Sequence, residues 1–597
     1  MTLPSRVPCC PWASPPREEI GGRSAARGAI RRATWWLGIG VAFLVALPVT
    51  AAGPLDEADS LLRAGRFEDA VSYLRPMVEA NPFNGEQAYY LGAALARAGR
   101  CDEALPHLDR ALSLGMDGER HGLRDAHLRA AECAARSGDH TEAVRRIRQA
   151  WTRHWANGLD VNRLPEDGLY EPARKLGLFA PLTGHTPEAN VGGLEARQRA
   201  DLTYFDRLIR ETHPGPFHTV SEEAWRQAVE ALDRRLPLDG PHFTLGLMRL
   251  ASSIYDGHTS VFPKISGEGA WRLLPIYIRW FTDGWVIAAA APEHADIVGA
   301  RIDGAAGKPI REIVEFARTA TARENDIAIY WLGGVFLSAY EVYEAANAAH
   351  GGEVALDLTL PDGKPRTVRL PAGPFNRHPG ARAAPQNWPA IGRDTLWLES
   401  PGTLYSTHWF EKQEALYVQV NQMRDGARQT MAEFAQSVFE ELTRRSARSL
   451  ILELRHNNGG DTDLVFKFLR GIDRYAPLQE DGAIIALIGP RSFSATMAMA
   501  GRLERDMNAL FVGWPTGGRP SVWGTERPFT LPYSGITGTI PVMWHQDGMG
   551  GNDIRPWIPP DIAIWPTRED ILRGHDPVLE QALKLAGKVG GRGGSPR

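Results

Sequence analysis

The chain has 597 residues, of which 43% are hydrophobic and 23% are charged, so it is long enough for several packed domains and too apolar for a disordered protein. Its formal charge is −4. Residues 1–52 carry six Arg and two Glu, so a chain cut after residue 52 would be more acidic still, and neither form favours a nucleic-acid partner.

Residues 1–52 resemble a targeting signal. Two arginines precede the uncharged stretch ATWWLGIGVAFLVALPVTAAG, which ends in small residues suited to signal peptidase near Ala51 or Ala52. An uncleaved membrane anchor is the alternative, because the stretch is nearly long enough to span a bilayer. Pro48 and the small residues at its end favour cleavage. We expect an exported protein, periplasmic or secreted, which contacts a membrane only if this segment is retained.

An internal repeat follows the signal. The segment RAGRFEDA starts at Arg63, RAGRCDEA at Arg97 and RSGDHTEA at Arg136. The first spacing is the period of tetratricopeptide helix pairs, so we predict a three-pair helical solenoid over residues 53–155. The concave face of such an array usually binds a protein partner, and a purely structural spacer is the alternative.

Two cysteines lie within the predicted repeats. Cys9 and Cys10 precede the expected cleavage site, which leaves Cys101 and Cys133. These two could form a disulfide in an oxidising compartment, or they could be small buried hydrophobic residues. Their spacing fits no metal site.

Four further segments follow in chain order. We predict a linker at 156–195, a helical segment at 196–265 ending in DGHT, a β-rich module at 266–370, and a last module at 393–587 in which strands and helices alternate. Such alternation predicts a parallel sheet with crossover helices, and ligands bind beyond the carboxyl ends of its strands. The fold class is therefore multidomain, with a helical solenoid followed by α/β modules.

Two neighbouring strands of the last module end abruptly in small and polar residues. Ser494 follows the strand and turn IALIGPRSF and opens a helix, where free N–H groups and the helix dipole favour developing negative charge. The amide of Ala495 could then donate to an oxyanion. The other strand ends in LRHNNGGD, and Gly459 and Gly460 allow a second N–H to approach the same oxyanion. The alternative is a plain turn and a helix cap supplied by Ser494 or Ser492.

A nucleophilic serine needs a base. His258 in YDGHTSV lies on a predicted tight turn after a helix, and His456 and His545 are the other candidates. The residues alone do not choose among the three.

The motifs DGHT, LRHNNGG, SFSA, VGWPTGG and PPDIAI, followed by GHDPVLEQAL, occur in the order of the carboxyl-terminal processing, or tail-specific, serine peptidases. The resemblance runs from about Leu202 to Leu583. It implies a crotonase-like α/β catalytic domain that hydrolyses peptide bonds, preceded by a helical segment and often by a PDZ domain. Ser494 matches the family's nucleophile.

The resemblance also discriminates between two branches of that family. The lysine branch places its base shortly after a T-x-G turn, where this chain has Arg519, and an arginine stays protonated. His258 matches the base of the tricorn-like branch, which works with a nearby carboxylate. Asp553 is the candidate for that carboxylate, although it is Asp for Glu and is offset by one residue, and Glu526 is the second candidate.

Recognition of substrate is less well defined by the motifs. The segment DIVGARIDGAAGKPI resembles the later part of a PDZ domain, without a clear carboxylate-binding loop before it, so we expect a degenerate PDZ-like module. The sequence predicts a serine endopeptidase acting on a protein or peptide, with no metal or organic cofactor. The alternative is an inactive peptidase-like scaffold that binds a protein or an apolar ligand.

Overall fold

The computed structural model describes residues 54–114, 120–153, 168–176, 178, 191–374, 383–546, 548 and 553–588. The predicted signal segment and most of the predicted linker lie outside these residues. The elements from Leu55 onward belong to one compact unit. No helix in the described ranges has both the length and the apolarity to cross a bilayer.

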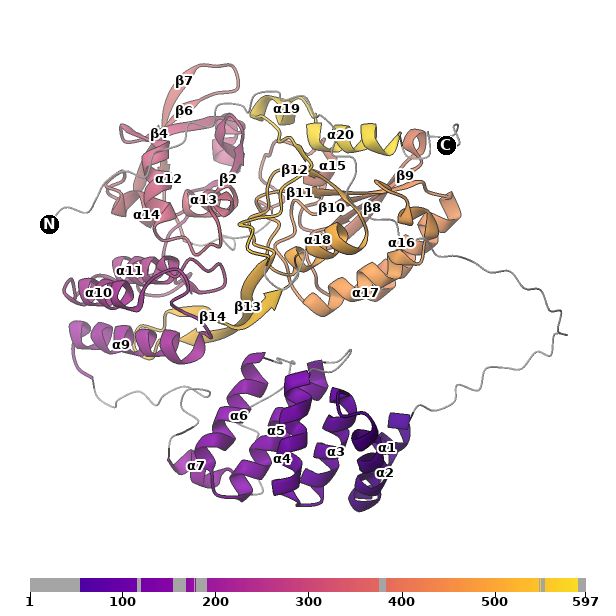
Figure 1. The fold of residues 1–597 in the computed structure, drawn as a ribbon. Helices are drawn as coiled ribbons and strands as arrows, with labels where there is room; N and C mark the ends of the chain where they lie inside the picture. The colour runs from indigo at the N-terminus through magenta and orange to yellow at the C-terminus, as the bar shows by residue number, and fades with distance from the viewer. Residues whose placement is uncertain are drawn as a thin grey trace, which may run out of the picture. The chain divides into compact units, whose positions relative to one another are not determined.

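The N-terminal region consists of helix pairs with short turns, as the repeat predicts (Figure 1). Ala70, Ala104 and Ala143 occupy equivalent positions in the second helix of each pair, and all three are fully buried. A disulfide joins Cys101 to Cys133, which resolves the alternative left open by the sequence. The helices are α1 Pro54–Arg63, α2 Phe67–Ala80, α3 Gly85–Arg97, α4 Cys101–Leu114, α5 Arg120–Arg136 and α6 His140–Arg153, followed by the short α7 Glu171–Lys175.

A three-helix segment and an antiparallel sheet follow. The helices are α9 Leu194–Thr212, α10 Glu222–Asp233 and α11 Gly240–Ser253. The strands are β2 Ile276–Phe281, β3 Gly284–Ala290, β4 Arg301–Ala305, β5 Lys308–Pro309, β6 Glu353–Thr359 and β7 Pro365–Pro371, and the helices between them are α12 Ile310–Arg318, α13 Ile329–Phe336 and α14 Tyr340–Ala345. These helices and strands share one hydrophobic core. The PDZ-like interpretation of this sheet stays a prediction.

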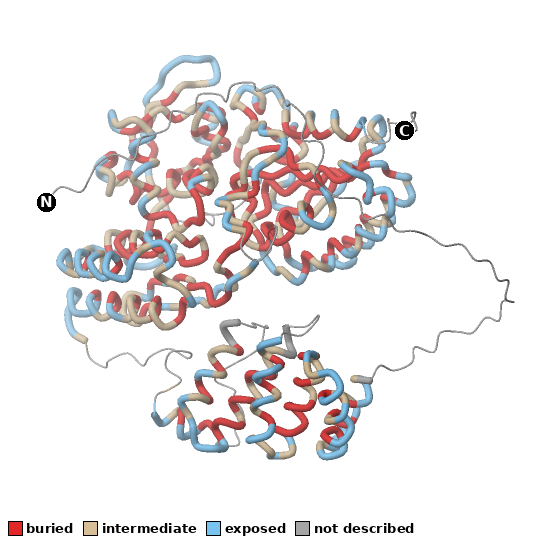
Figure 2. The backbone as a smooth tube through the Cα atoms, in the orientation of Figure 1, coloured by how far each residue is buried: buried red, intermediate tan, exposed pale blue. Residues whose placement is uncertain are grey.

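The C-terminal sheet has the order β15-β12-β11-β10-β9-β8, and every neighbouring pair except β8 and β9 is parallel. Its strands are β8 Tyr405–Phe410, β9 Ala415–Val420, β10 Ser449–Glu453, β11 Ile484–Ile488, β12 Leu510–Gly513 and β15 Ile562–Ala563. Strands β9, β10 and β11 are buried along their whole length (Figure 2). Strands buried on both faces read as continuous apolar runs, which is why the sequence revealed them.

Helices cover both faces of this sheet (Figure 1). One face packs against α16 Met431–Arg445, α17 Thr462–Asp473 and α18 Ala495–Asp506. The other packs against α20 Pro577–Ala586. A shorter helix, α15 Leu396–Glu399, precedes the sheet, and α19 Arg568–Leu572 precedes α20. The crossover helices place the starts of α17 and α18 beside each other at the carboxyl ends of the parallel strands.

A third sheet ties the helical segment to the C-terminal module. Strand β1 Ser260–Phe262 pairs with β14 Thr537–Gln546, which pairs with β13 Ser521–Thr530, both antiparallel. Strand β1 begins two residues after His258. The pairing of Ser260 with Thr539 therefore fixes the position of the histidine turn relative to the parallel sheet.

Candidate active site

Ser494 lies at the junction between β11 and α18 in an unusual backbone conformation. Its φ is 56° and its ψ is −125°, and its side chain makes no capping hydrogen bond. A non-glycine residue with positive φ is strained, and such strain clusters at functional sites, including the nucleophile turns of hydrolases. The Ser494 hydroxyl is thus available for another partner.

The neighbouring Ser492 has a structural role instead. Its hydroxyl is buried, donates to the carbonyl of Leu454 at 3.1 Å and accepts from the N–H of Gly489 at 3.1 Å. It thereby joins the ends of β10 and β11.

The glycine turn packs directly against the serine turn. A Cβ at Gly459 would lie 2.5 Å from the Cβ of Ser494 and 2.9 Å from the amide nitrogen of Ala495, and the φ of Gly459 is 104°. Only glycine fits this approach and this backbone conformation. A Cβ at Gly460 would lie 2.1 Å from the carbonyl oxygen of Met423. The two strand ends singled out in the sequence therefore form one site.

The three predicted oxyanion residues differ in how their amides are engaged. The N–H of Gly459 donates to Oδ1 of Asn457 at 2.9 Å, which leaves it no free hydrogen for an oxyanion. In the described part of the chain, the amides of Ala495 and Gly460 have no such acceptor. Ala495 is the first residue of α18, where N–H groups lack partners within the helix. Ala495 and Gly460 thus fit the donor role, and Gly459 provides the space.

His258 reaches Ser494 from the turn between α11 and β1. Its Nε2 lies 3.0 Å from Oγ of Ser494. Its ring stacks on Phe493 with 4.7 Å between centroids, and its carbonyl accepts a hydrogen bond from Thr539 Oγ1 on β14 at 3.0 Å. Base and nucleophile are 236 residues apart in sequence and within hydrogen-bonding distance in space.

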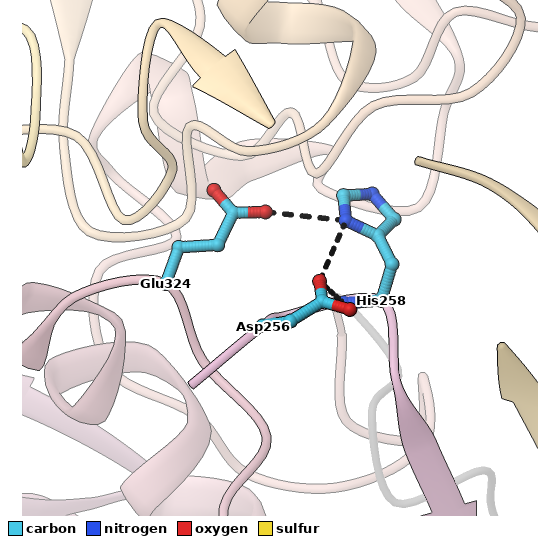
Figure 3. A group of neighbouring side chains, drawn as sticks. All are labelled: Asp256, His258 and Glu324. Atoms are coloured by element: carbon cyan, nitrogen blue, oxygen red, sulfur yellow. Dashed lines mark hydrogen bonds and ion pairs between the residues drawn. The ribbon is translucent and has the colours of Figure 1, made fainter. Parts of the chain in front are cut away.

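The other ring nitrogen of His258 faces carboxylates (Figure 3). Oε1 of Glu324 lies 3.1 Å from Nδ1, and Oδ1 of Asp256 lies 3.9 Å from it. Both carboxylates are buried with the imidazole. In Figure 3 the second ring nitrogen points away from both acids, and this nitrogen, Nε2, is the one that lies 3.0 Å from Oγ of Ser494.

Glu324 is itself held in place by Arg519. The N–H of Arg519 donates to Oε2 of Glu324 at 2.8 Å, and its Nε donates to the backbone carbonyl of Glu324 at 2.7 Å. Arg519 is the residue that the sequence resemblance places at the position of the base of the lysine branch. In this chain it contacts the carboxylate next to the histidine.

Asp256 organises the histidine turn. Its Oδ1 accepts the backbone N–H of His258 at 2.9 Å, and its Oδ2 accepts the hydroxyl of Thr259 at 2.6 Å. Nε2 of His213 lies 3.1 Å from the same Oδ2, and Nδ1 of His213 accepts the N–H of Gly215. With Nδ1 an acceptor, Nε2 carries the proton and donates to Asp256.

The structure does not bring Asp553 to the site. Asp553 accepts from the guanidinium of Arg555, with Oδ2 only 2.6 Å from Nη2, and Arg555 also binds Glu504. The structure thus does not support Asp553 as the third member, because a cation two residues away pairs with it and Glu324 lies at Nδ1 of His258. Glu526 on β13 comes closer, with Oε1 3.8 Å from His258, but it faces Nε2 on the serine side of the ring.

The other candidate bases have other partners, although His545 lies near the site: a Cβ at Gly524 would be 3.3 Å from Nε2 of His545 and 3.9 Å from Nε2 of His258. His456 is buried with its ring 4.9 Å from Trp397, and Nε2 of His545 lies 2.9 Å from the hydroxyl of Thr525. Glu324, by contrast, was not among the carboxylates that the sequence predicted as partners of the histidine. It sits in the polar segment TARENDIA between two helices, and its identification required the contact with residue 519, which no local pattern reports.

Electrostatics at the site raise the basicity of the histidine. Burial disfavours the imidazolium, but the interaction with Glu324 and the negative charges of Glu526 and Asp256 outweigh it and raise the pKa of His258 to about 9. Burial raises the pKa of Glu324, and its pairing with His258 opposes that rise. Burial also disfavours ionised Asp256, yet the hydrogen bond from His213 and the nearby charges lower its pKa overall.

One cluster among the described residues has ligand atoms close enough together to hold a metal ion. It consists of Asp256, His258 and Glu324, whose ligand atoms lie within 4.8 Å of one another. Asp256 accepts from three groups and Oε2 of Glu324 accepts from Arg519, whereas Nδ1 of His258 and Oε1 of Glu324 face each other at 3.1 Å. These contacts suit a histidine that takes the proton of Ser494 at Nε2 while Glu324 and Asp256, at Nδ1, stabilise the imidazolium.

The tetratricopeptide repeat model matches residues 55–119, which confirms the repeat prediction over that range. No curated protein matches the sequence. Among solved structures, mature CPAF complexed with lactacystin is similar at 14% identity and a TM-score of 0.49, over 66% of this chain and 98% of that one.

Two further solved structures are similar. Mature CPAF shares 14% identity at a TM-score of 0.49, over 67% of this chain and 99% of that one. The photosystem II D1 C-terminal processing protease shares 14% identity at a TM-score of 0.33, over 65% and 97%. The structural neighbours of this chain thus include a C-terminal processing protease.

Proposed function

We propose that this chain is a serine peptidase of the tail-specific type in which Ser494 is the nucleophile, His258 the general base and Glu324 the acid that orients the base. The observation that carries the proposal is the continuous contact from Ser494 Oγ to His258 Nε2, at 3.0 Å, and from His258 Nδ1 to Glu324, at 3.1 Å. A nucleophile, a base and an orienting acid in this order are the requirement for acyl transfer.

In the proposed reaction Nε2 of His258 takes the hydroxyl proton as Ser494 attacks the peptide carbonyl. The imidazolium that forms is stabilised by Glu324 and Asp256. The amides of Ala495 and Gly460 donate to the tetrahedral oxyanion, and the strained serine turn keeps Oγ exposed to the carbonyl. His258 then protonates the leaving amine, and water releases the acyl-enzyme.

A peptide is the proposed substrate because the motifs that converge here, DGHT, LRHNNGG and SFSA, are those that resemble the tail-specific family. The crotonase-like assignment of the catalytic domain and the tricorn-like assignment of the base belong to this proposal.

The proposed location is outside the cytoplasm. The disulfide between Cys101 and Cys133 supports export, since such bonds persist mainly in oxidising compartments. The repeats are proposed to hold a protein partner or substrate. N-terminal sequencing of the protein from its native host tests the location: a start near Ala52 or Gly53 supports cleavage, and an intact segment in the membrane fraction supports an anchor.

The catalytic proposal is tested with a fluorophosphonate probe, which reacts only with an activated serine. We expect the parent protein to be labelled at Ser494, as located by mass spectrometry, and to cleave an unfolded protein. Ser494→Ala should lose both properties, with turnover falling by a factor on the order of 10⁴ or more. Unchanged cleavage by Ser494→Ala at unchanged melting temperature would instead support a binding scaffold.

A further inference from the structure

Two adjoining cavities open beside the base. The first has a volume of about 220 Å³, and its lining includes Gly257, Phe493 and Glu526. Gly257 precedes His258, Phe493 precedes Ser494, and Glu526 faces Nε2 of His258. Residues that line the first cavity are therefore neighbours of His258 and Ser494, although neither of these two residues lines it.

The second cavity adjoins the first. It has a volume of about 190 Å³ and shares Ser260, Phe262, Ala322 and Leu332 with the first as lining residues. A side chain bound in the second cavity would thus be separated from the first cavity by no more than these shared lining residues.

The second cavity has the character of a side-chain pocket. Its walls come from α11, through Met248 and Ala251, from α13, through Val335 and Phe336, and from Trp271, and no charged side chain lines it. An apolar cavity of about 150 Å³ is large enough to hold benzene. A space of 190 Å³ therefore accommodates the aromatic ring of a phenylalanine side chain.

We propose that the second cavity receives a large apolar side chain of the substrate, from a residue next to the scissile bond, and that the peptidase prefers peptides with such a residue. This inference rests on the proposed function. The occupant is a substrate side chain because the cavity continues from the space beside His258. Large apolar residues gain most there, since removing an aromatic side chain from water into an apolar pocket is favourable and a methyl group would leave the pocket unfilled.

The inference predicts a measurable selectivity. Pairs of peptides would be compared that differ at a single position next to the cleaved bond. One peptide of each pair has Phe at that position and the other has Ala, and each flanking position is tested in turn. At one position we expect kcat/KM to be higher for Phe by about tenfold or more, because each methylene in a fitting pocket contributes several-fold. Cleavage sites would be located by mass spectrometry, so that the register of each peptide is known.

Two substitutions of lining residues sharpen the test. Ala322→Leu fills the boundary between the cavities and should bring the Phe-to-Ala ratio close to one. Leu332→Ala enlarges the same boundary and should raise the Trp-to-Phe ratio several-fold. Leu250→Ala is the matched control, because Leu250 is a buried leucine of α11 that does not line either cavity, and it should keep both ratios at the parent's values.

The outcomes separate this inference from the proposed function. If the parent is neither labelled by the fluorophosphonate nor able to cleave any peptide, the proposed function fails and the inference fails with it. If the parent is labelled and cleaves but shows no preference for large apolar residues, the pocket assignment alone is overturned. The pocket assignment is also overturned if the Phe-to-Ala and Trp-to-Phe ratios of kcat/KM stay at the parent's values in both Ala322→Leu and Leu332→Ala.

Discussion

Two glutamates approach the imidazole of His258 from opposite sides, and they come from contrasting surroundings. The side chain of Glu324 is 4% exposed and lies at Nδ1, where Arg519 holds it by two hydrogen bonds. The side chain of Glu526 is 45% exposed and lies 3.8 Å from Nε2, on a strand at the edge of a sheet. Distance to the imidazole alone does not define the orienting acid. A buried carboxylate held at Nδ1, such as Glu324, can orient the ring, whereas an exposed carboxylate at Nε2, such as Glu526, only adds negative charge near it.

The largest effect is expected when the buried glutamate loses its charge. Glu324→Gln keeps the size of the side chain but can neither stabilise the imidazolium nor hold the Nδ1–H tautomer, so kcat should fall by a factor on the order of 10³ to 10⁴. Steady-state cleavage of a peptide measures it. Glu526→Gln is the matched control and should remain active. Loss of activity in the control instead of in Glu324→Gln would reverse the two assignments.

A smaller loss is expected when the support of Glu324 is weakened. Arg519→Ala removes the Nε donor to the carbonyl of Glu324 but keeps the backbone N–H that binds Oε2, so the acid should be mispositioned and not lost. We expect kcat to fall by roughly 10-fold to 100-fold with KM little changed. Arg519→Lys, which retains a donor, should recover part of the loss, and equal losses in the two variants would contradict a positioning role.

The exposed glutamate should act through the pKa of the base. The groups that face the imidazole are Glu324 and Asp256 at Nδ1, and Glu526 and the hydroxyl of Ser494 at Nε2. With a pKa of about 9, His258 is mostly protonated at neutral pH, and the base must be neutral to accept a proton. Activity should therefore rise with pH through about 9.

Glu526→Gln removes one of the charges that raise this pKa, so the rise should move to lower pH. Roughly one His258 in a hundred is neutral two pH units below its pKa, and a shift of one unit would raise activity near pH 7 by up to about tenfold. The dependence of kcat/KM on pH in the parent and the variant measures the shift. A displacement towards higher pH would contradict the sign of the interaction.

The smallest effect is expected at Asp553. Asp553→Asn weakens the pair with Arg555 without touching the base, so kcat/KM should stay within about twofold of the parent. The melting temperature should fall slightly, as expected for a loss of about 1 kcal/mol in the free energy of unfolding. A loss of activity comparable to that of Glu324→Gln would restore Asp553 as the third member.

The sequence predicted the C-terminal sheet well because each of its elements carries a local signal. The segment MAEFAQSVFEELTRR forms α16, and Thr430 and Glu433 form a capping box at its start. The serine, the histidine and the glycine turn could be identified because their motifs are short and contiguous. The convergence of the serine and the glycine turn could be predicted because parallel strands end at the same edge of a sheet, whereas His258 is placed by the pairing of β1 with β14.

The third member could not be predicted in the same way. The approach of Glu324 to His258 depends on Arg519, 195 residues after Glu324, which holds the carboxylate, and on the pairing of β1 with β14, which fixes the histidine turn. Asp553 lies shortly before the terminal PPDIAI motif, where the family resemblance places the acid. However, its carboxylate forms an ion pair with Arg555, two residues away. Which carboxylate pairs with a histidine is decided by tertiary contacts and competing cations, and neither has a period or a spacing that a sequence displays.

The pairing of β1 with β14 determines when, during synthesis of the chain, the candidate active site can assemble. The ribosome makes His258 long before Ser494, and β14, which holds the carbonyl of His258 through Thr539, ends at Gln546. Until about nine-tenths of the chain has been synthesised, base and nucleophile have no shared framework. Under the proposed function, a nascent chain is therefore unable to cut itself or its neighbours, and proteolysis would begin only when the last modules have folded together.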